Sequence, residues 1–300
     1  MSLVATLICH PANPALDSTV LDGARAILPS AGSAQWLFDE VAADIPFGDG
    51  SEDVAAIAHR LRAAREDLPI DIVVQPVVGR RKKLFLADMD STMIGQECID
   101  ELADFAGLKA HVAAITERAM RGEIAFEPAL RERVALLKNL PASVIDTVLA
   151  ERIHLTAGGP TLVATMRANG AYTSLVSGGF TAFTSRLAAA IGFDEQRANT
   201  LLVDAASRLT GEVADPILGR EAKLETLNAL RQRFQLNPED TLAVGDGAND
   251  LPMVRAAGLG IAYHGKPALR EAAAACIDHG NLTALLYAQG YRREEFVARG

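Results

Sequence analysis

The chain has 300 residues, of which 49% are hydrophobic, and its 38 acidic and 29 basic side chains give a formal charge of −9. This composition predicts a globular protein, and the acidic charge argues against a nucleic-acid partner because phosphate polymers bind dense positive surfaces. Three widely spaced cysteines and the absence of a long apolar segment predict reduced thiols, no membrane partner and a cytoplasmic location.

Residues 1–78 alternate between strand and helix patterns, which predicts a small α+β domain. Strands are expected at 3–8, around 36–38 and at 70–74, and helices at 20–28 and 54–61. The segment contains no cluster of catalytic side chains. A proline, a glycine and four basic residues within 76–83 interrupt the periodicity, so a domain boundary is expected there.

The second domain, residues 79–300, begins with a short apolar strand at 84–87 and continues with helical periodicity to residue 153. Strand and helix patterns then alternate, with strands expected at 172–176, 241–244 and 259–263, helices at 162–168, 181–191 and 221–234, and a hairpin over 201–213. This order predicts a parallel α/β core, residues 79–92 and 154–300, interrupted by a helical insertion at 93–153.

Four places in this domain are rich in catalytic residue types. They are Asp88-Met89-Asp90, Ser177-Gly178-Gly179, Lys223 and the run Gly245-Asp246-Gly247-Ala248-Asn249-Asp250. Three of them follow or lie near the end of an expected strand, and in a parallel sheet such positions share one crevice. Carboxylates gathered there repel one another unless a cation joins them, and oxygen ligands with a phosphate substrate select Mg²⁺.

A phosphate monoester also needs a positive side chain and free backbone N–H groups, which Lys223 and the Ser177 loop can supply. Asp88 and Asp90 alternate along the chain and point roughly the same way, so one can attack phosphorus while the other transfers the proton. Each motif alone has a plainer interpretation as a turn, a cap, a loop or a solvated helix residue. Their occurrence together favours a catalytic site.

These motifs resemble, in the same order, the four motifs of the haloacid dehalogenase superfamily, and within it the phosphoserine phosphatase family. The resemblance implies a Rossmann-like core with a helical cap, and hydrolysis of O-phospho-L-serine through an aspartyl-phosphate at the last step of serine biosynthesis. It implies that Asp88 is the nucleophile and Asp90 the general acid/base. It further implies the remaining roles: Mg²⁺ held by Asp88, Asp246 and the carbonyl of Asp90; phosphoryl oxygens held by Ser177, Gly178 and Lys223; and support from Asn249 and Asp250.

The expected cap, residues 93–153, is where substrate selection is predicted. Phosphoserine carries an ammonium and a carboxylate beside its phosphate, so Glu97 could meet the ammonium and Arg133 the carboxylate. Met120 and Phe126 could close the pocket against water. All four match substrate-contacting positions of the family, although an exposed Glu or Arg on a helix is by itself usually solvated.

Other functions stay open at this point. The enzyme could act on another small phosphomonoester or transfer the phosphoryl group to an alcohol, since superfamily motifs do not choose a substrate. Alternatively, the chain could be a regulatory binding protein without turnover. Residues 1–78 weakly resemble ACT-like domains, which implies serine binding, pairing of subunits into a homodimer, or a purely structural role.

Overall fold

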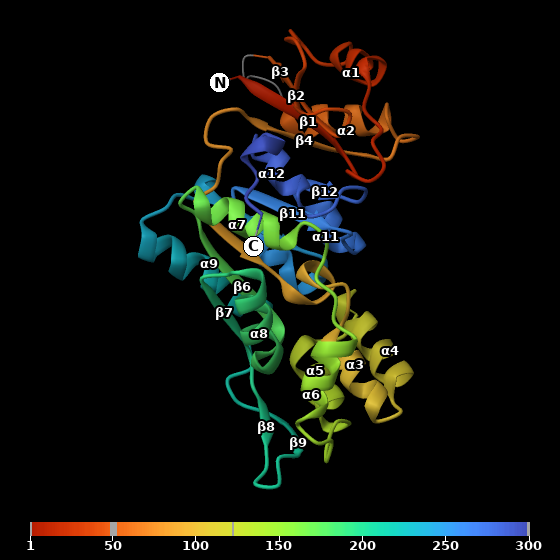
Figure 1. Ribbon diagram of the computed structural model, residues 1–300, viewed down its shortest axis with the longest axis vertical. Helices are drawn as coiled ribbons and strands as arrows, with labels where there is room; N and C mark the ends of the chain where they lie inside the picture. The colour runs from red at the N-terminus through yellow and green to blue at the C-terminus, as the bar shows by residue number, and fades with distance from the viewer. Residues whose placement is uncertain (1, 49–52, 122, 299–300) are drawn as a thin grey trace.

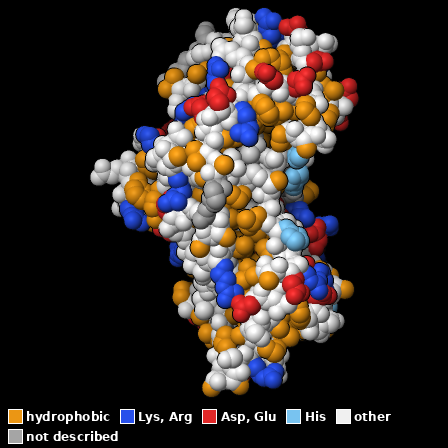
Figure 2. Space-filling model, viewed as in Figure 1, with side chains coloured by type: hydrophobic (Ala, Val, Ile, Leu, Met, Phe, Trp, Pro, Cys, Tyr) orange, Lys and Arg blue, Asp and Glu red, His pale blue; other side chains and the backbone are white. Residues whose placement is uncertain are grey.

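The computed structural model describes residues 2–48, 53–121 and 123–298. Figure 1 shows three parts along the long axis: a small N-terminal module, a central α/β core, and a helical cap at the opposite end. Within the described residues, no helix has the length and apolar character needed to cross a membrane. On the face shown in Figure 2, acidic and basic side chains are interspersed, so that face carries no continuous basic surface.

The N-terminal module is a four-stranded antiparallel sheet with the strand order β2-β3-β1-β4 and two helices. Its elements are β1 (Leu3–Cys9), α1 (Ser18–Arg25), β2 (Gln35–Phe38), β3 (Ala42–Phe47), α2 (Val54–Ala63) and β4 (Ile70–Pro76). The side chains of Asp17 and Asp53 cap the two helices by accepting backbone N–H bonds. The βαββαβ order confirms the predicted α+β class.

Strand β3 was not expected from the sequence, because Asp44 and Pro46 lower its strand propensity. In the structure, the buried Asp44 carboxylate accepts a hydrogen bond from Thr6 Oγ1 at 2.7 Å and forms an ion pair with Arg80. These partners are distant in the sequence, and they offset the cost of burying a charge in the sheet.

The core is a six-stranded parallel sheet with the order β12-β11-β10-β5-β6-β7. Its strands are β5 (Leu84–Ala87), β6 (Tyr172–Phe180), β7 (Glu195–Asn199), β10 (Thr241–Gly245), β11 (Leu259–Tyr263) and β12 (Ala275–Ile277). Its helices are α7 (Gly159–Ala168), α8 (Thr181–Ile191), α9 (Arg220–Phe234), α10 (Leu251–Ala256), α11 (Pro267–Ala272) and α12 (Ala284–Ala288), with 3₁₀ turns at Pro238–Asp240, Ala248–Asp250 and Arg293–Glu295. The predicted parallel α/β core is confirmed, although β7 and β12 were not foreseen.

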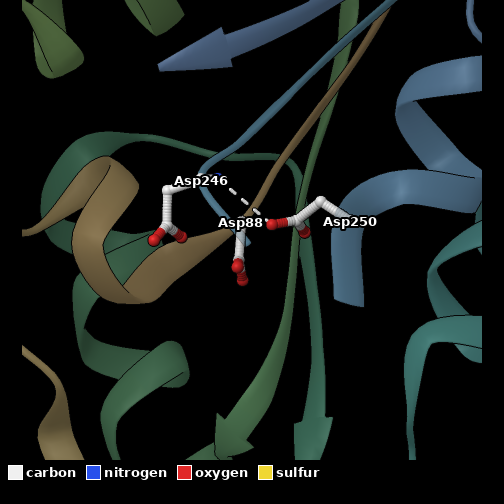
Figure 3. Close-up of side chains that lie close together, drawn as sticks. All are labelled: Asp88, Asp246 and Asp250. Carbon is white, nitrogen blue, oxygen red and sulfur yellow. Dashed lines mark hydrogen bonds between the residues drawn. The ribbon is translucent and has the colours of Figure 1, made fainter. Parts of the chain in front are cut away.

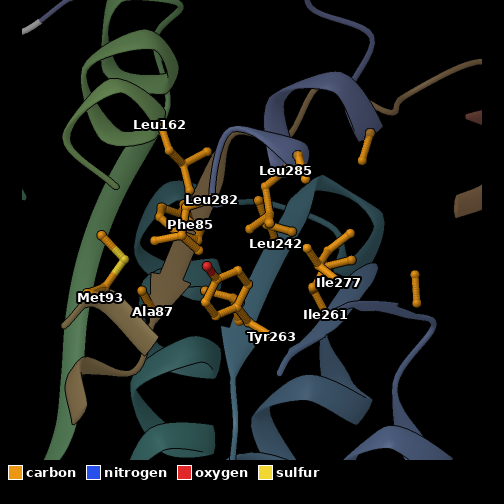
Figure 4. Close-up of a cluster of buried hydrophobic side chains, with 14 of the residues drawn as sticks. Phe85, Ala87, Met93, Leu162, Leu242, Ile261, Tyr263, Ile277, Leu282 and Leu285 are labelled. Carbon is orange, nitrogen blue, oxygen red and sulfur yellow. The ribbon is translucent and has the colours of Figure 1, made fainter. Parts of the chain in front are cut away.

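Strand β5 is buried on both faces, because its four residues are all apolar and fully covered. Leu84 and Leu86 pack in a cluster with residues of α9 and α10. Phe85 and Ala87 point to the other face, toward α7 and α12 (Figure 4). Burying each large apolar side chain contributes about 1.5–3 kcal/mol. The strand is therefore a rigid support for Asp88, the residue that follows it.

The cap consists of four helices, which confirms that the insertion is helical. They are α3 (Cys98–Phe105), α4 (Lys109–Met120), α5 (Phe126–Ala135) and α6 (Val144–Glu151). The hairpin β8 (Leu201–Val203) and β9 (Leu209–Val213) projects from the core and lies beside these helices (Figure 1). Backbone hydrogen bonds from Asn139 to Leu209 (2.9 Å) and from Leu209 to Leu140 (2.8 Å) join the hairpin to the cap.

The N-terminal module rests on the core through buried polar contacts. Asp71 of β4 accepts backbone N–H bonds from Asp278 (2.7 Å), His279 (3.2 Å) and Gly280 (2.7 Å). Burial raises the pKa of Asp71, and these three N–H groups oppose that rise. The contacts hold the module against the loop that precedes α12.

Candidate active site

The register of the core sheet brings three predicted motifs to one edge. Ala87 of β5 pairs with Val244 of β10 and with Leu175 of β6. In parallel strands with this register, the residues that come next lie at the same end of the sheet. Ser177, Gly178 and Gly179 lie within β6 where its pairing with β7 is irregular, and this stretch is called the Ser177 loop below. Asp88, Asp246 and Ser177 consequently lie together, as the sequence predicted.

Asp88 lies at the centre of a buried charged cluster. Its Oδ1 is 2.7 Å from Lys223 Nζ and accepts a hydrogen bond from Met89 N at 2.8 Å. Lys223 Nζ also donates to Asp250 Oδ1 at 2.6 Å, and all three charged side chains are at most 3% exposed. Figure 3 shows Asp88, Asp246 and Asp250 gathered around the end of β5. Both of these contacts of Asp88 involve Oδ1, and Oδ2 takes part in neither of them.

The electrostatics of this cluster are dominated by burial. The pKa of Asp88 is raised to about 7: burial is the largest cause, the charge of Asp250 adds to it, and Lys223 opposes the shift. Burial, followed by the charges of Asp250 and Asp88, raises the pKa of Asp246 well above its usual range. Although burial alone would lower it, the two carboxylates raise the pKa of Lys223. One lysine thus neutralises part of a site with three carboxylates.

The donor set suits a hard cation. Asp88, Asp246 and Asp250 each offer a carboxylate oxygen, and these oxygens lie within 4.8 Å of one another. Oδ1 of Asp246 is buried and has no hydrogen-bond partner among the described residues. Such an uncompensated carboxylate oxygen fits a metal ligand, because a buried charge without a partner is costly. The residues present therefore fit a divalent cation with oxygen ligands.

Asp250 differs from Asp246 in its bonding. Its Oδ2 accepts backbone N–H bonds from Asp246 (3.2 Å) and Gly247 (3.1 Å), while Oδ1 binds Lys223. A Cβ on Gly245 would lie 2.2 Å from Asp250 Cγ, so glycine is required for the carboxylate to reach this position. Asp250 therefore joins the backbone of this loop to Lys223.

Asp90 is held next to Ser177. Its Oδ1 accepts from Cys98 N at 2.9 Å and its Oδ2 from Ser177 Oγ at 3.4 Å. Burial raises the pKa of Asp90, opposed mainly by the hydrogen bond from Cys98. A Cβ on Gly179 would lie 2.8 Å from Asp90 Oδ2, so only glycine lets the Ser177 loop approach this carboxylate.

The cap residues close a cavity over these groups. Glu97 Oε1 accepts from Ser91 Oγ at 2.6 Å, and burial, followed by Asp90 and Asp246, raises the pKa of Glu97 well above its usual range. Arg133 is 5% exposed and donates to Ala129 O and Thr116 Oγ1, both at 3.0 Å. The predicted residues that line the cavity are Asp88, Asp90, Glu97, Phe126, Arg133, Ser177, Gly178 and Asn249.

Lys223 and Asp246 are buried beside Asp88 and do not line the cavity. Met120 ends α4, and its side chain is outside the part of the chain that the structure describes. Asn249 reaches the cavity with its Oδ1 buried and without a hydrogen-bond partner among the described residues.

Two supporting interactions were not predicted from the sequence. Thr116 Oγ1 accepts the bond from Arg133 and donates to Asp100 Oδ1 at 2.7 Å, which orients the guanidinium. Asn199, at the end of β7, bonds both the Ser177 loop and the segment before α9. The sequence gives no local indication of these two interactions. It does indicate part of the apolar lining of the cavity, because Ile99 and Leu130 fall within helical apolar patterns.

Residues 85–255 match the haloacid dehalogenase-like hydrolase family. Over 238 residues the chain is 43% identical to a phosphoserine phosphatase of Archaeoglobus fulgidus, covering 79% of this chain and 69% of that protein. Two further relatives are matched over only 57% of their length, so the chain spans little more than half of them.

Two solved structures extend the likeness. A haloacid dehalogenase family hydrolase from Salmonella enterica serovar Typhi has a TM-score of 0.84 and 28% identity, with 96% of this chain and 98% of that chain covered. A phospho-aspartyl intermediate analogue of phosphoserine phosphatase has a TM-score of 0.65 and 41% identity, covering 68% of this chain and 97% of the other. The chain therefore belongs to the haloacid dehalogenase-like hydrolases, among the phosphoserine phosphatases, as its motifs indicated.

Proposed function

We propose that this chain hydrolyses O-phospho-L-serine to L-serine and phosphate, as the last step of serine biosynthesis. The observation that carries the proposal is the pairing of groups in one cavity: Asp88 and Asp90 on the core side, Glu97 and Arg133 on the cap side. A carboxylate and a guanidinium opposite a phosphoryl site match the ammonium and carboxylate of phosphoserine.

In the proposed mechanism, Asp88 Oδ2 attacks phosphorus and the bond from phosphorus to the serine oxygen breaks. Asp90 protonates the departing alkoxide and then removes a proton from the water that hydrolyses the aspartyl-phosphate. The raised pKa of Asp90 suits a group that must carry this proton. Ser177, the N–H groups of its loop and Lys223 hold the phosphoryl oxygens.

We propose Mg²⁺ as the cofactor, held by the carboxylates of Asp88 and Asp246 with the backbone carbonyl of Asp90. When bound, it would polarise the phosphoryl group and neutralise charge at the attacking carboxylate. The unpartnered Oδ1 of Asp246 supports this ligand, and Asn249 and Asp250 would support the phosphate and the surrounding loop.

The decisive experiment measures phosphate release, with and without Mg²⁺, from phosphoserine, phosphoethanolamine and 3-phosphoglycerate. The last two lack the carboxylate and the ammonium respectively. Arg133→Gln is expected to lower kcat/KM for phosphoserine about 100-fold and to change that for phosphoethanolamine little, because an unpaired buried charge costs a few kcal/mol. Glu97→Gln should likewise lower kcat/KM for phosphoserine and change that for 3-phosphoglycerate little, because 3-phosphoglycerate has no ammonium for Glu97 to meet.

Arg131→Gln is the matched control. Arg131 lies on the same helix, but it is exposed and pairs with Glu127 and Asp215 at 2.8 and 2.7 Å. Its loss should change none of the three rates. Faster hydrolysis of another monoester would favour a phosphatase with a different substrate. Faster transfer of the phosphoryl group to an added alcohol would favour a phosphotransferase.

We further propose two units: residues 1–78 as a structural, serine-binding or dimer-forming ACT-like domain, and 79–300 as the phosphatase domain with its cap at 93–153. The buried contacts of Asp71 support a docked module. Titrating the intact chain with L-serine, and measuring its mass in solution, would distinguish these roles. The unpaired thiols of Cys9, Cys98 and Cys276 fit the proposed cytoplasmic location.

A further inference from the structure

Asn199 is a buried amide that touches two separate parts of the active site. It is 2% exposed and ends β7. Its Nδ2 donates to Gly178 O at 2.8 Å and to Leu218 O at 3.1 Å, and its Oδ1 accepts from Leu218 N at 2.7 Å. One side chain therefore joins the Ser177 loop to the segment that leads into α9.

The bond to Gly178 O controls the orientation of the following peptide. Gly178 O and Gly179 N–H belong to one planar peptide unit, so holding the carbonyl on one side points the N–H to the other. There Gly179 N donates to Ser177 Oγ at 2.8 Å, and Ser177 Oγ is 3.4 Å from Asp90 Oδ2. Because glycines flank this peptide, its backbone has little intrinsic preference to stay in place.

The bonds to Leu218 act on the other side of the phosphoryl site. Leu218 precedes Gly219, the N-terminal cap residue of α9, and Lys223 lies in the first turns of that helix. Two bonds to the same backbone residue fix both its donor and its acceptor. Asn199 thus sets the spacing between the loop with Ser177 and the helix with Lys223.

We propose that Asn199 is a positioning residue for phosphoryl binding, which locks the peptide between Gly178 and Gly179 and the start of α9 in one geometry. It acts through Ser177 and Lys223 and does not contact the substrate. This inference rests on the proposed phosphatase function. Without the amide, the freed peptide could turn its carbonyl toward an anionic substrate, which would repel it.

Asn199→Asp tests the proposal, because the two side chains have the same shape while the carboxylate faces two carbonyl oxygens. We expect kcat/KM for phosphoserine to fall about 10- to 100-fold, and the dissociation constant of inorganic phosphate, measured by calorimetry, to rise by a similar factor. Gln289→Glu is the matched control: this buried amide donates to Leu285 O at 2.9 Å and accepts from Lys82 N at 3.0 Å, away from the cavity.

A double-mutant cycle with Ser177→Ala separates positioning from general stability. If Asn199 acts through Ser177, the double variant loses much less than the product of the two single losses. The proposal would be overturned if the loss of kcat/KM in the double variant equalled the product of the two single losses. It would also be overturned if Gln289→Glu, at a matched melting temperature, lost as much kcat/KM as Asn199→Asp. Asn199→Ala replaces the aspartate variant if that protein does not fold. The affinity for inorganic phosphate tests the role of Asn199 even if the wild type does not hydrolyse phosphoserine. A failure of the proposed function can therefore be distinguished from a failure of the proposal for Asn199.

Discussion

Replacing Lys223 with methionine would remove the one lysine that holds Asp88 and Asp250 together. Methionine has a similar length and leaves two buried carboxylates whose oxygens lay 2.7 and 2.6 Å from Nζ. Removing one partner of a buried ion pair costs about 3–5 kcal/mol of unfolding free energy. We expect a loss of that size at pH 8, measured by urea unfolding without Mg²⁺.

The loss should depend on pH in a defined direction. Burial, together with the charge of Asp250 and against Lys223, raises the pKa of Asp88 from 3.8 to about 7, so this group stabilises the fold less as the pH rises toward 7. Without Lys223 its pKa rises further, and the variant keeps a proton that the wild type releases. Between pH 6 and pH 8 the difference between the two proteins should therefore grow by about 1.4 kcal/mol.

Lys82→Met is the control for this experiment. Lys82 is also buried, but its Nζ donates to the carbonyl oxygens of Gly79 (3.0 Å) and Glu239 (2.8 Å) instead of two buried carboxylates. Its loss should cost about 1–3 kcal/mol, with little change between pH 6 and pH 8. If Lys223→Met lost the same free energy of unfolding at pH 6 and pH 8, Lys223 would not control the ionisation of Asp88, and the reasoning would be refuted.

Three further predictions concern the loop, the metal and the module. Gly179→Ala should lower kcat/KM about 10-fold or more with little change in melting temperature, because the added Cβ would lie 2.8 Å from Asp90 Oδ2. Unchanged kinetics would contradict the close approach of Gly179 to Asp90. Mg²⁺ should raise the melting temperature more at pH 8 than at pH 6, since protons compete for Asp88 below its pKa of about 7; equal shifts would count against Asp88 as a ligand. Asp71→Asn should lower the free energy of unfolding in urea by about 1–3 kcal/mol, because an NH₂ group replaces one of the two carboxylate oxygens that accept backbone N–H bonds. An unchanged midpoint would show that these bonds do not anchor the module.

Features set by short stretches of sequence were predictable. The apolar strand 84–87 and the carboxylates that follow it can be identified from nine consecutive residues, and the helical insertion from its periodicity. The convergence of Asp88, Ser177 and Asp246 followed from the general rule for parallel sheets.

Features that depend on distant partners were not predictable. Strand β3 contains Asp44 and Pro46, and the charge is compensated by Thr6 and Arg80. Strand β7 is polar, and it is held by pairing with β6. Asn199 had no local signal at all, because its partners are about twenty residues away on either side.

The proposed reaction requires Asp88 to form an aspartyl-phosphate from phosphoserine. The direct measurement is brief incubation with [³²P]phosphoserine and Mg²⁺, acid quenching, and identification of the labelled peptide. We expect label on the peptide that contains Asp88, and neither label nor phosphate release in Asp88→Asn with its fold retained. Label on another residue, or substantial turnover by Asp88→Asn, would contradict it.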